Sequence, residues 1–179
     1  MPSRLIPTIA VLTFVALGAA SAGAQQSAAP NPLDVVPEKM PFDLPYGPPI
    51  ALARANDAIA AAVGEARKHD WKLNVAVVDS GGNLVAFQRM DGAQLASIQI
   101  AEHKARASVN FRRETKVWEN AIQVSGYQYV MTLDGVIASR GGIPLIEGGK
   151  LIGAIGCSGG TGSQDEVACQ AGVAALKKP

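Results

Sequence analysis

The stretch GGIPLIEGGKLIGAIGCSGGTGSQDEVACQAG, residues 141–172, contains the pattern that decides the fold. Two apolar runs flank Gly148 and Gly149, a pair that suits the tight turn of a β-hairpin. A glycine-rich loop then leads to Ser163, which is expected to cap a helix, and to two acids that favour the positive end of the helix dipole. The order strand, strand, helix predicts an antiparallel sheet with a helix packed on it.

A second hairpin lies upstream, because LNVAVVDSGGNLVAFQRM, residues 73–90, contains two β-rich runs around a glycine turn. Composition and periodicity also predict three helices and two short strands. Helices are expected over residues 50–70, 95–111 and 114–126, and short strands over residues 127–133 and 135–139. Together these elements predict an α+β domain, with a central antiparallel sheet of about five strands and helices packed on it.

The helix expected over residues 95–111 has two apolar stripes. At 100° per residue, one stripe contains Leu95, Ile98, Ala101, Ala105 and Val109, and the other contains Ala96, Ile100, Ala107 and Phe111. The polar strip between them contains Gln99, His103, Arg106 and Asn110. A helix with two apolar faces needs two partners, so the pattern predicts either a homo-oligomer or a second internal helix.

The N-terminal residues 1–24 have the pattern of a secretory signal peptide. Arg4 precedes an apolar run that is too short for the roughly 20 residues of a membrane span, and Ala22 and Ala24 form an A-x-A cleavage site. We therefore expect a periplasmic or secreted protein with no membrane span after cleavage; the alternative is a short membrane anchor. Residues 25–45 are rich in proline and predict a linker or arm, followed by the domain over residues 46–177. Met40, Phe42, Leu44 and Tyr46 would dock the end of the arm.

Charge composition argues against a nucleic-acid partner. Cleavage would remove one of the 16 basic side chains, Arg4, and the 15 that remain would balance 15 acidic ones. Arg112 and Arg113 form an isolated basic pair, and no basic face of the kind that binds phosphates is visible. An anionic membrane surface is disfavoured for the same reason.

The two cysteines, Cys157 and Cys169, are 12 positions apart on an expected strand end and the following helix. In an oxidising compartment they would form a disulfide, and as buried free thiols they would act as small apolar side chains. The sequence leaves both alternatives open.

The loop over residues 158–162 matches no phosphate-binding motif, since the lysine of a P-loop is missing and the register of a dinucleotide fingerprint is wrong. Its backbone amides at a helix start would suit an anion or carboxylate, or the loop only joins strand to helix. The sequence GCSGG is no nucleophile elbow, and Asp165 and Glu166 would point about 100° apart on a helix. No catalytic residue is predicted, and whether the protein is an enzyme stays open.

Four segments in fixed order resemble the haem-binding GlcG/HbpS-like family, which includes the C-terminal domain of PduO-type cobalamin adenosyltransferases. They are VAVVDSGGNLVAFQRMDGA (75–93), HKARASVNF (103–111), RGGIPLIEGGKLIGAIGCSGG (140–160) and QDEVACQAG (164–172). The resemblance implies an α+β fold, homo-oligomeric assembly and binding of haem or a related tetrapyrrole. With its N-terminal signal, the chain looks like the exported branch of the family.

Haem needs an axial ligand for its iron and cations for its propionates. His103, in the polar strip, is the first candidate for the iron ligand, and His69 is the second; the alternative for both is a solvated or hydrogen-bonded histidine. The cationic candidates are Arg89, Lys104 and Arg106, of which the first two match recurrent family positions and would otherwise be structural ion-pair partners. The amides of Ser158 and Gly159 are candidates for a carboxylate.

These observations predict an exported, oligomeric haem-binding protein that sequesters or presents its ligand. Two alternatives remain from the sequence. One is an accessory protein or enzyme that acts on a small organic acid, and the other is a partner of an envelope sensor that is contacted through the proline-rich arm.

Overall fold

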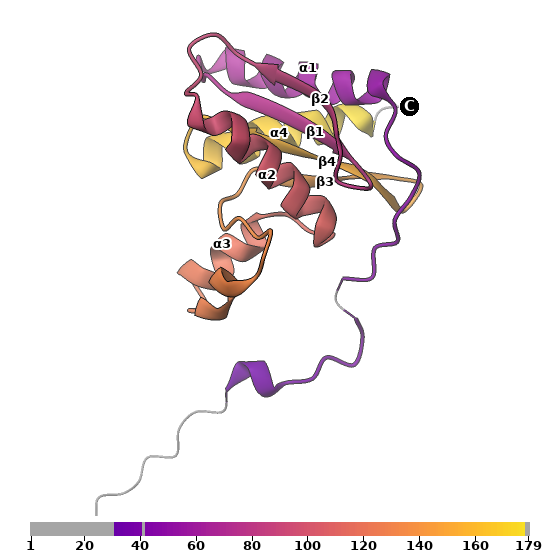
Figure 1. Cartoon of the computed structure of the whole chain (residues 1–179), viewed down its shortest axis with the longest axis vertical. Coiled ribbons are helices and arrows are strands. Elements are labelled where there is room, and N and C mark those ends of the chain that lie inside the picture. Colours follow the sequence, from indigo (N-terminus) through magenta and orange to yellow (C-terminus); the bar gives the residue numbers. More distant parts are fainter. Residues whose placement is uncertain (1–30, 41, 178–179) are drawn as a thin grey trace, which may run out of the picture. The chain divides into compact units, whose positions relative to one another are not determined.

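The computed structural model describes residues 31–40 and 42–177 (Figure 1). The predicted signal peptide over residues 1–24 lies outside this part of the chain. Among the described residues, no helix is both long enough and apolar enough to cross a membrane.

The chain divides into two units, residues 1–38 and residues 39–179. In the described part of the first unit, Pro32–Asp34 form one turn of 3-10 helix, η1, whose first N–H groups are capped by Asn31. The second unit contains the predicted domain and all the elements described below.

The sheet has four strands, β1 (Asn74–Asp79), β2 (Leu84–Arg89), β3 (Gly142–Glu147) and β4 (Lys150–Ser158). Their order is β2-β1-β4-β3, and every pair is antiparallel. Both predicted hairpins are therefore confirmed, and the α+β class with them. The β1–β4 pairing joins the two hairpins into one sheet.

The two short strands predicted between the hairpins are wrong, so the sheet has only the four hairpin strands and not the predicted number of about five. Residues Gln128–Thr132 form a 3-10 helix, η2, and residues 135–139 are irregular. Gly126 and Gly135 adopt positive φ values of 69° and 76° on either side of η2. Tyrosine and valine favour a strand only where a sheet edge is available to pair with, so their local preference did not decide the structure.

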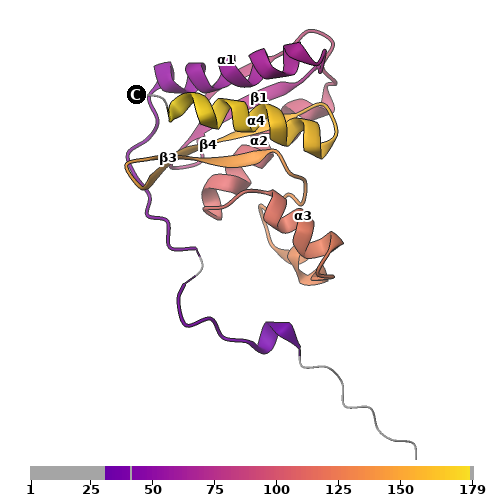
Figure 2. The ribbon, with the colours of Figure 1, turned by 180° about the vertical axis from the view of Figure 1, so that it is seen from behind.

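Helices cover both faces of the sheet (Figures 1 and 2). α1 (Leu52–Lys68) and α4 (Gly162–Leu176) lie side by side on one face, and α2 (Ala96–Asn110) lies on the other. The short α3 (Lys116–Gln123) follows α2, with Thr115 at its N-terminus as predicted. The domain thus has three layers.

Each face of the sheet has its own apolar core. The cluster on the α1 and α4 side includes Ala55, Ile59, Ala62, Val63, Val75, Val77, Leu145, Ile155 and Ala168. The smaller cluster beneath α2 contains Val78, Ala105, Val109, Leu151 and Ala154.

Glycines set the distance between α2 and the sheet. Gly142 and Gly156 are cross-strand partners on β3 and β4. A Cβ atom on Gly142 would overlap the carbonyl oxygen of Lys104, and one on Gly156 would overlap that of Ala101. The backbone of α2 therefore rests directly on the backbone of the sheet, which no other residue type at these two positions would allow.

The two predicted stripes of α2 have different surroundings. Ala101, Ala105 and Val109 are fully buried against the sheet. From the second stripe, Ala107 is buried, and Phe111 packs edge-on against Trp118 of α3 at 5.1 Å between ring centroids. A second internal helix thus covers the C-terminal part of this stripe.

A disulfide joins Cys157 at the end of β4 to Cys169 in α4, with 5.8 Å between the Cα atoms. The structure thereby decides between the two alternatives that the sequence left open. Closing a loop of this length stabilises a fold by about 3 kcal/mol, chiefly through the unfolded chain.

The residues before α1 dock on the domain, as their apolar character predicts. Tyr46 forms a parallel bridge with Leu151, and its hydroxyl donates to the carbonyl oxygens of Val109 and Asn110, both at 3.1 Å. Phe42 stacks under the guanidinium of Arg113, 3.1 Å from the ring centroid. Met40 is exposed and does not take part.

Candidate functional site

Beneath α2 lies a buried polar centre formed by Lys104 and Asp165. The two side chains are 2% and 3% exposed, and Lys104 Nζ lies 2.8 Å from Asp165 Oδ2. The ammonium also donates to the carbonyl oxygen of Cys157 at 3.1 Å. Burial raises the pKa of Asp165, against the opposing effects of Lys104 and of the backbone N–H groups of Gly159 and Gly160. Lys104, a predicted propionate contact, is thus committed to an internal ion pair.

The glycine-rich loop does hold a carboxylate, and that carboxylate belongs to the same chain. Gly160 N–H donates to Asp165 Oδ1 at 3.0 Å, and Thr161 N–H donates to Gln164 Oε1 at 2.8 Å. Ser158 is 4% exposed. A Cβ atom on Gly159 would overlap the backbone of Lys72, so the loop is pressed against the domain. The amides of Gly160 and Thr161 in the loop therefore already have partners within the chain.

The cap of α4 differs from the prediction by two residues. Thr161, and not Ser163, begins the helix, and its side chain forms a capping box with Gln164. Both residues lie next to the loop, so the cap and the Asp165 contact fix the same turn.

Next to this centre, Arg140 joins α3 to α4. Its Nε donates to Glu119 Oε1 at 2.7 Å, its Nη1 donates to Glu166 Oε2 at 3.3 Å, and Lys116 donates to Glu166 at 2.8 Å. The hydrogen bond with Glu119 raises the pKa of Arg140. These charges are paired with one another within the domain.

His103, the first candidate for the iron ligand, is half-buried on α2. Arg106, one turn further along, is exposed and pairs with Glu102 at 2.9 Å. The structure therefore places one imidazole and one guanidinium on the same surface of α2. Asp165 hydrogen-bonds Lys104 and Gly160 and not His103, so no Ser-His-Asp relay forms among the described residues.

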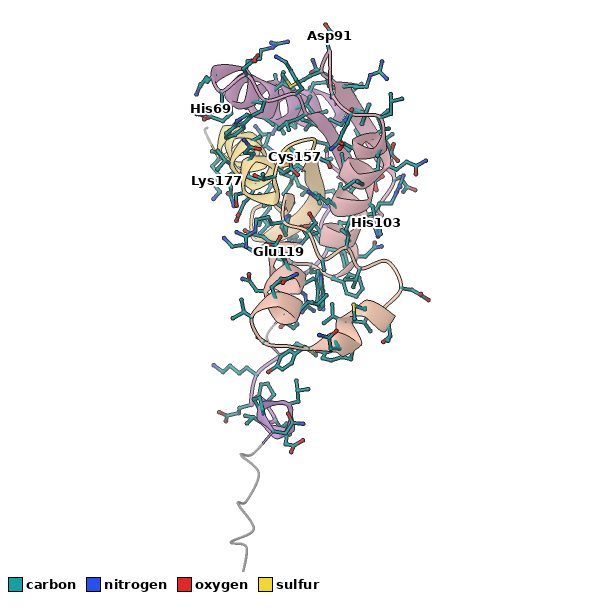
Figure 3. The ribbon with its side chains drawn as sticks, turned by 90° about the vertical axis from the view of Figure 1, so that its left-hand side faces the viewer. His69, Asp91, His103, Glu119, Cys157 and Lys177 are labelled. Atoms are coloured by element: carbon teal, nitrogen blue, oxygen red, sulfur yellow. A yellow bond between two sulfur atoms is a disulfide. The ribbon has the colours of Figure 1, made fainter. Side chains whose placement is uncertain are left out.

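His69 lies on the other side of the domain (Figure 3). It ends α1, stacks on Trp71 at 4.4 Å between centroids, and lies 3.3 Å from a carboxylate oxygen of Glu65. Nearby, Arg89 lines a polar hollow of about 420 Å³ with Arg67, Lys72, Gln88, Met90 and Asp91. The cations of this hollow could hold an anionic group. The seven predicted site residues thus fall into three places and do not form one site within a protomer.

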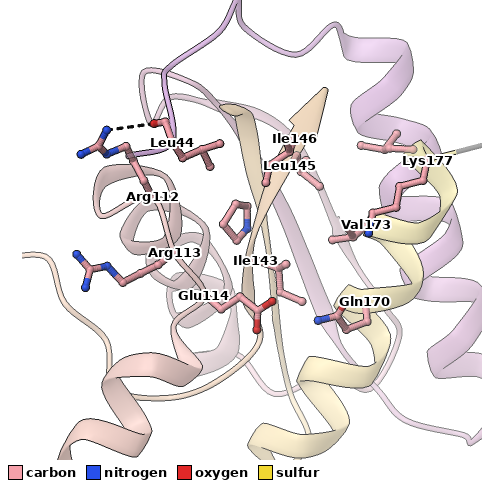
Figure 4. Close-up of a pocket in the computed structure, with 12 residues that line it drawn as sticks. Leu44, Arg112, Arg113, Glu114, Ile143, Leu145, Ile146, Gln170, Val173 and Lys177 are labelled. Atoms are coloured by element: carbon pink, nitrogen blue, oxygen red, sulfur yellow. Dashed lines mark hydrogen bonds between the residues drawn. The ribbon is translucent and has the colours of Figure 1, made fainter. Parts of the chain in front are cut away.

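A second cavity, of about 270 Å³, was not predicted. It lies between β3, the C-terminal half of α4 and the turn between α2 and α3 (Figure 4). Of its lining residues, the sequence had singled out the basic pair Arg112 and Arg113 and the docking residue Leu44, and most of the other walls come from β3 and α4. Its lining residues are Leu44, Arg112, Arg113, Glu114, Ile143, Pro144, Leu145, Ile146, Gln170, Val173, Leu176 and Lys177.

Residues 50–174 match the model of the family "Haem degrading protein HbpS-like". The chain belongs to this family. Its relative GlcG from Escherichia coli K12 is 39% identical over 104 residues, which cover 58% of this chain and 77% of GlcG. The family match over residues 50–174 includes both hairpins, α1, α2, α3 and nearly all of α4.

Two solved structures show the same fold. The crystal structure of HbpS has a TM-score of 0.68 and 31% identity, over 76% of this chain and 96% of that one. The structure described as a PduOC:Heme complex has a TM-score of 0.66 and 30% identity, over 72% of this chain and 96% of that one. Among the described residues, no group of three or more His, Cys, Asp and Glu side chains is placed to hold a metal ion.

Proposed function

We propose that this chain is an exported haem-binding protein that works as a homo-oligomer and sequesters or presents its ligand. The observation that carries the proposal is the 30% identity to a domain crystallised with haem, over 96% of that domain. Family membership over residues 50–174 supports it.

The donor set fits a tetrapyrrole when more than one copy contributes. An imidazole suits the iron and cations suit the propionates. His103 and Arg106 share one surface, whereas Arg89, Arg67 and Lys72 surround a hollow that no histidine lines. We infer that a complete site combines groups from two copies of the chain.

Exposed apolar side chains around α3 and η2 support the oligomer. Val124 is 79% and Met131 66% exposed, and Val117 and Tyr129 are exposed beside them in the sequence. Covering such side chains is the usual reason why a soluble domain pairs with another copy. For export, the disulfide between Cys157 and Cys169 suits an oxidising compartment and agrees with a signal peptide over residues 1–24.

A hemin titration of the purified protein tests the proposal. We expect a shifted Soret band that saturates at a fixed ratio of hemin to protomer, and loss of the shift in His103→Ala. His69→Ala is the matched control, because its imidazole already stacks on Trp71 at the other side of the domain, and it should titrate like the wild type. If the Soret band of hemin did not shift on addition of the protein in either redox state, the proposal of haem binding would be wrong.

A second candidate function is that of a partner of an envelope sensor. It is favoured by the exposed apolar side chains of the arm, Leu33, Val35 and Val36. Deleting residues 25–40 would abolish capture of such a partner while leaving the Soret shift in place.

A further inference from the structure

The cavity between β3 and α4 is built to accept something other than a peptide. Thr115 N–H donates to the outward carbonyl oxygen of Gly142 at 3.0 Å, and the outward N–H of Gly142 donates to Thr115 Oγ1 at 2.9 Å. Two residues further along this edge, Pro144 has no N–H to offer. An incoming strand would find no continuous ladder on β3, so the space suits a small molecule.

Its size limits the ligand. About 270 Å³ holds on the order of ten non-hydrogen atoms, at about 30 Å³ for each water-sized group. This is near the lower limit of small-molecule pockets and far below what a tetrapyrrole fills. By itself, the cavity within one copy of the chain is too small for a tetrapyrrole.

The middle of the cavity is apolar. Ile143 and Leu145 are buried on β3, and Val173 of α4 lies across from them (Figure 4). Leu176 of α4 packs against the same cluster, and Pro144 also lines the cavity. An alkyl or aryl group in this space would be removed from water, which favours its binding.

Charge is divided between the two ends. In Figure 4, Arg112 and Lys177 lie on opposite walls toward one end, whereas Glu114 and Gln170 face each other at the other end. Arg112 uses Nη1 for the carbonyl oxygen of Leu44 at 3.1 Å, and no ion pair forms with Arg112, Glu114 or Lys177 among the described residues.

Arg113 adds a fixed positive charge beside the cationic end. Its guanidinium lies between the rings of Phe42 and Trp118, 3.1 and 4.6 Å from their centroids. Burial lowers the pKa of Arg113, which means that its charged form has lost solvation that a nearby anion would partly restore.

We propose that this cavity binds a small apolar monocarboxylate. The carboxylate lies against the Lys177 ammonium, at the end of the cavity that Arg112 flanks from the opposite wall, and the apolar tail lies over Pro144 toward Val173. Glu114 at the far end repels a second carboxylate, so the site discriminates between a monoacid and a diacid of the same length.

Calorimetric titrations with octanoate and with suberate, the diacid of equal length, test this. We expect octanoate to bind and suberate to bind at least tenfold more weakly. Lys177→Gln should weaken octanoate about tenfold, the usual effect of losing one charge-assisted contact. Glu114→Gln should bring suberate close to octanoate. Lys150→Gln, at the exposed first residue of β4, is the control and should bind both like the wild type.

Val173→Trp would fill the cavity and should abolish octanoate binding while leaving the hemin titration unchanged, so this inference and the haem proposal succeed or fail separately. Methyl NMR of the wild-type protein gives a second readout, with octanoate-induced shifts expected at Ile143 and Leu145. Equal binding of octanoate and suberate, or octanoate shifts confined to other methyl groups, would overturn the inference.

Discussion

At the residue scale, Lys104 and Asp165 show that a side chain of the type that binds ligands can instead stabilise the fold. From the sequence alone, Lys104 was expected to contact a ligand, and Asp165 was explained as an acid in the first turn of a helix. Their sequence separation of 61 residues is closed by the packing of α2 and α4 on opposite faces of the sheet. The carboxylate of Asp165 also accepts a hydrogen bond from the N–H of Gly160, so this amide of the glycine-rich loop is bound by a side chain of the same chain and not by an external anion.

Removing one partner of this pair should cost far more than removing both. Asp165→Ala leaves a buried ammonium without a counter-charge, so we expect a loss of about 3–5 kcal/mol in the free energy of unfolding. The double variant Lys104→Met, Asp165→Ala should lose much less than the sum of the losses in Lys104→Met and Asp165→Ala. Urea unfolding of the wild type, these two single variants and the double variant measures the coupling.

The exposed pair of Arg106 and Glu102 on the same helix is the control. Arg106→Gln should change the free energy of unfolding by less than about 1 kcal/mol, because solvent screens this pair. If Asp165→Ala lowered the free energy of unfolding by no more than Arg106→Gln does, the buried pair would contribute little to stability.

At the scale of elements, the contact between α2 and the sheet depends on two glycines that are neighbours only in the folded protein. Gly142 belongs to β3 and Gly156 to β4, and their cross-strand pairing creates the space that α2 fills. The small residues Ala101 and Ala105 on the facing side of α2 complete this close approach.

Adding a single methyl group at this contact should separate the layers. In Gly156→Ala the new Cβ overlaps backbone atoms of Ala101 and Ala105, which no side-chain rotation relieves, so we expect a loss of about 1–3 kcal/mol or more. Gly64→Ala is the matched control, since nothing lies within 4 Å of its Cβ position in α1. It should stabilise the protein by up to about 1 kcal/mol. Thermal unfolding that is equal for both variants would contradict the close contact.

At the scale of the whole molecule, the domain buries both faces of its sheet but leaves the region of α3 and η2 with exposed apolar side chains. From the sequence, the apolar surface that needs a partner was predicted on α2. In the structure α3 covers part of that surface, and exposed apolar side chains lie on and next to α3 and η2. This region is the surface that we expect a second copy to cover.

Charge at this surface should therefore weaken the oligomer. For Val124→Asp combined with Met131→Asp, we expect sedimentation velocity to show a lower mass than for the wild type, because each aspartate would be desolvated in the interface. Leu52→Asp, at the exposed start of α1, is the control and should keep the wild-type mass. An unchanged mass for the double variant would place the interface elsewhere.

Much of the fold follows from local pattern. The type and approximate bounds of both hairpins and of the long helices could be predicted from their glycine turns and their apolar periodicity. These features depend on hydrogen bonding and apolar spacing within a short segment of the chain. Residues 127–133 were predicted wrongly, since whether tyrosine and valine form a strand depends on a neighbouring edge that the segment itself does not contain.

The candidate sites depended on tertiary structure. The sequence by itself determined the α+β class, the family and which side chains could carry chemistry. Only the packed structure decided that Lys104 and the amides of Gly160 and Thr161 are used internally, that His69 and His103 lie on different sides of the domain, and that Arg112, Glu114 and Lys177 line one cavity. Which charges find a partner is a property of distances between segments far apart in the chain, and no local pattern contains those distances.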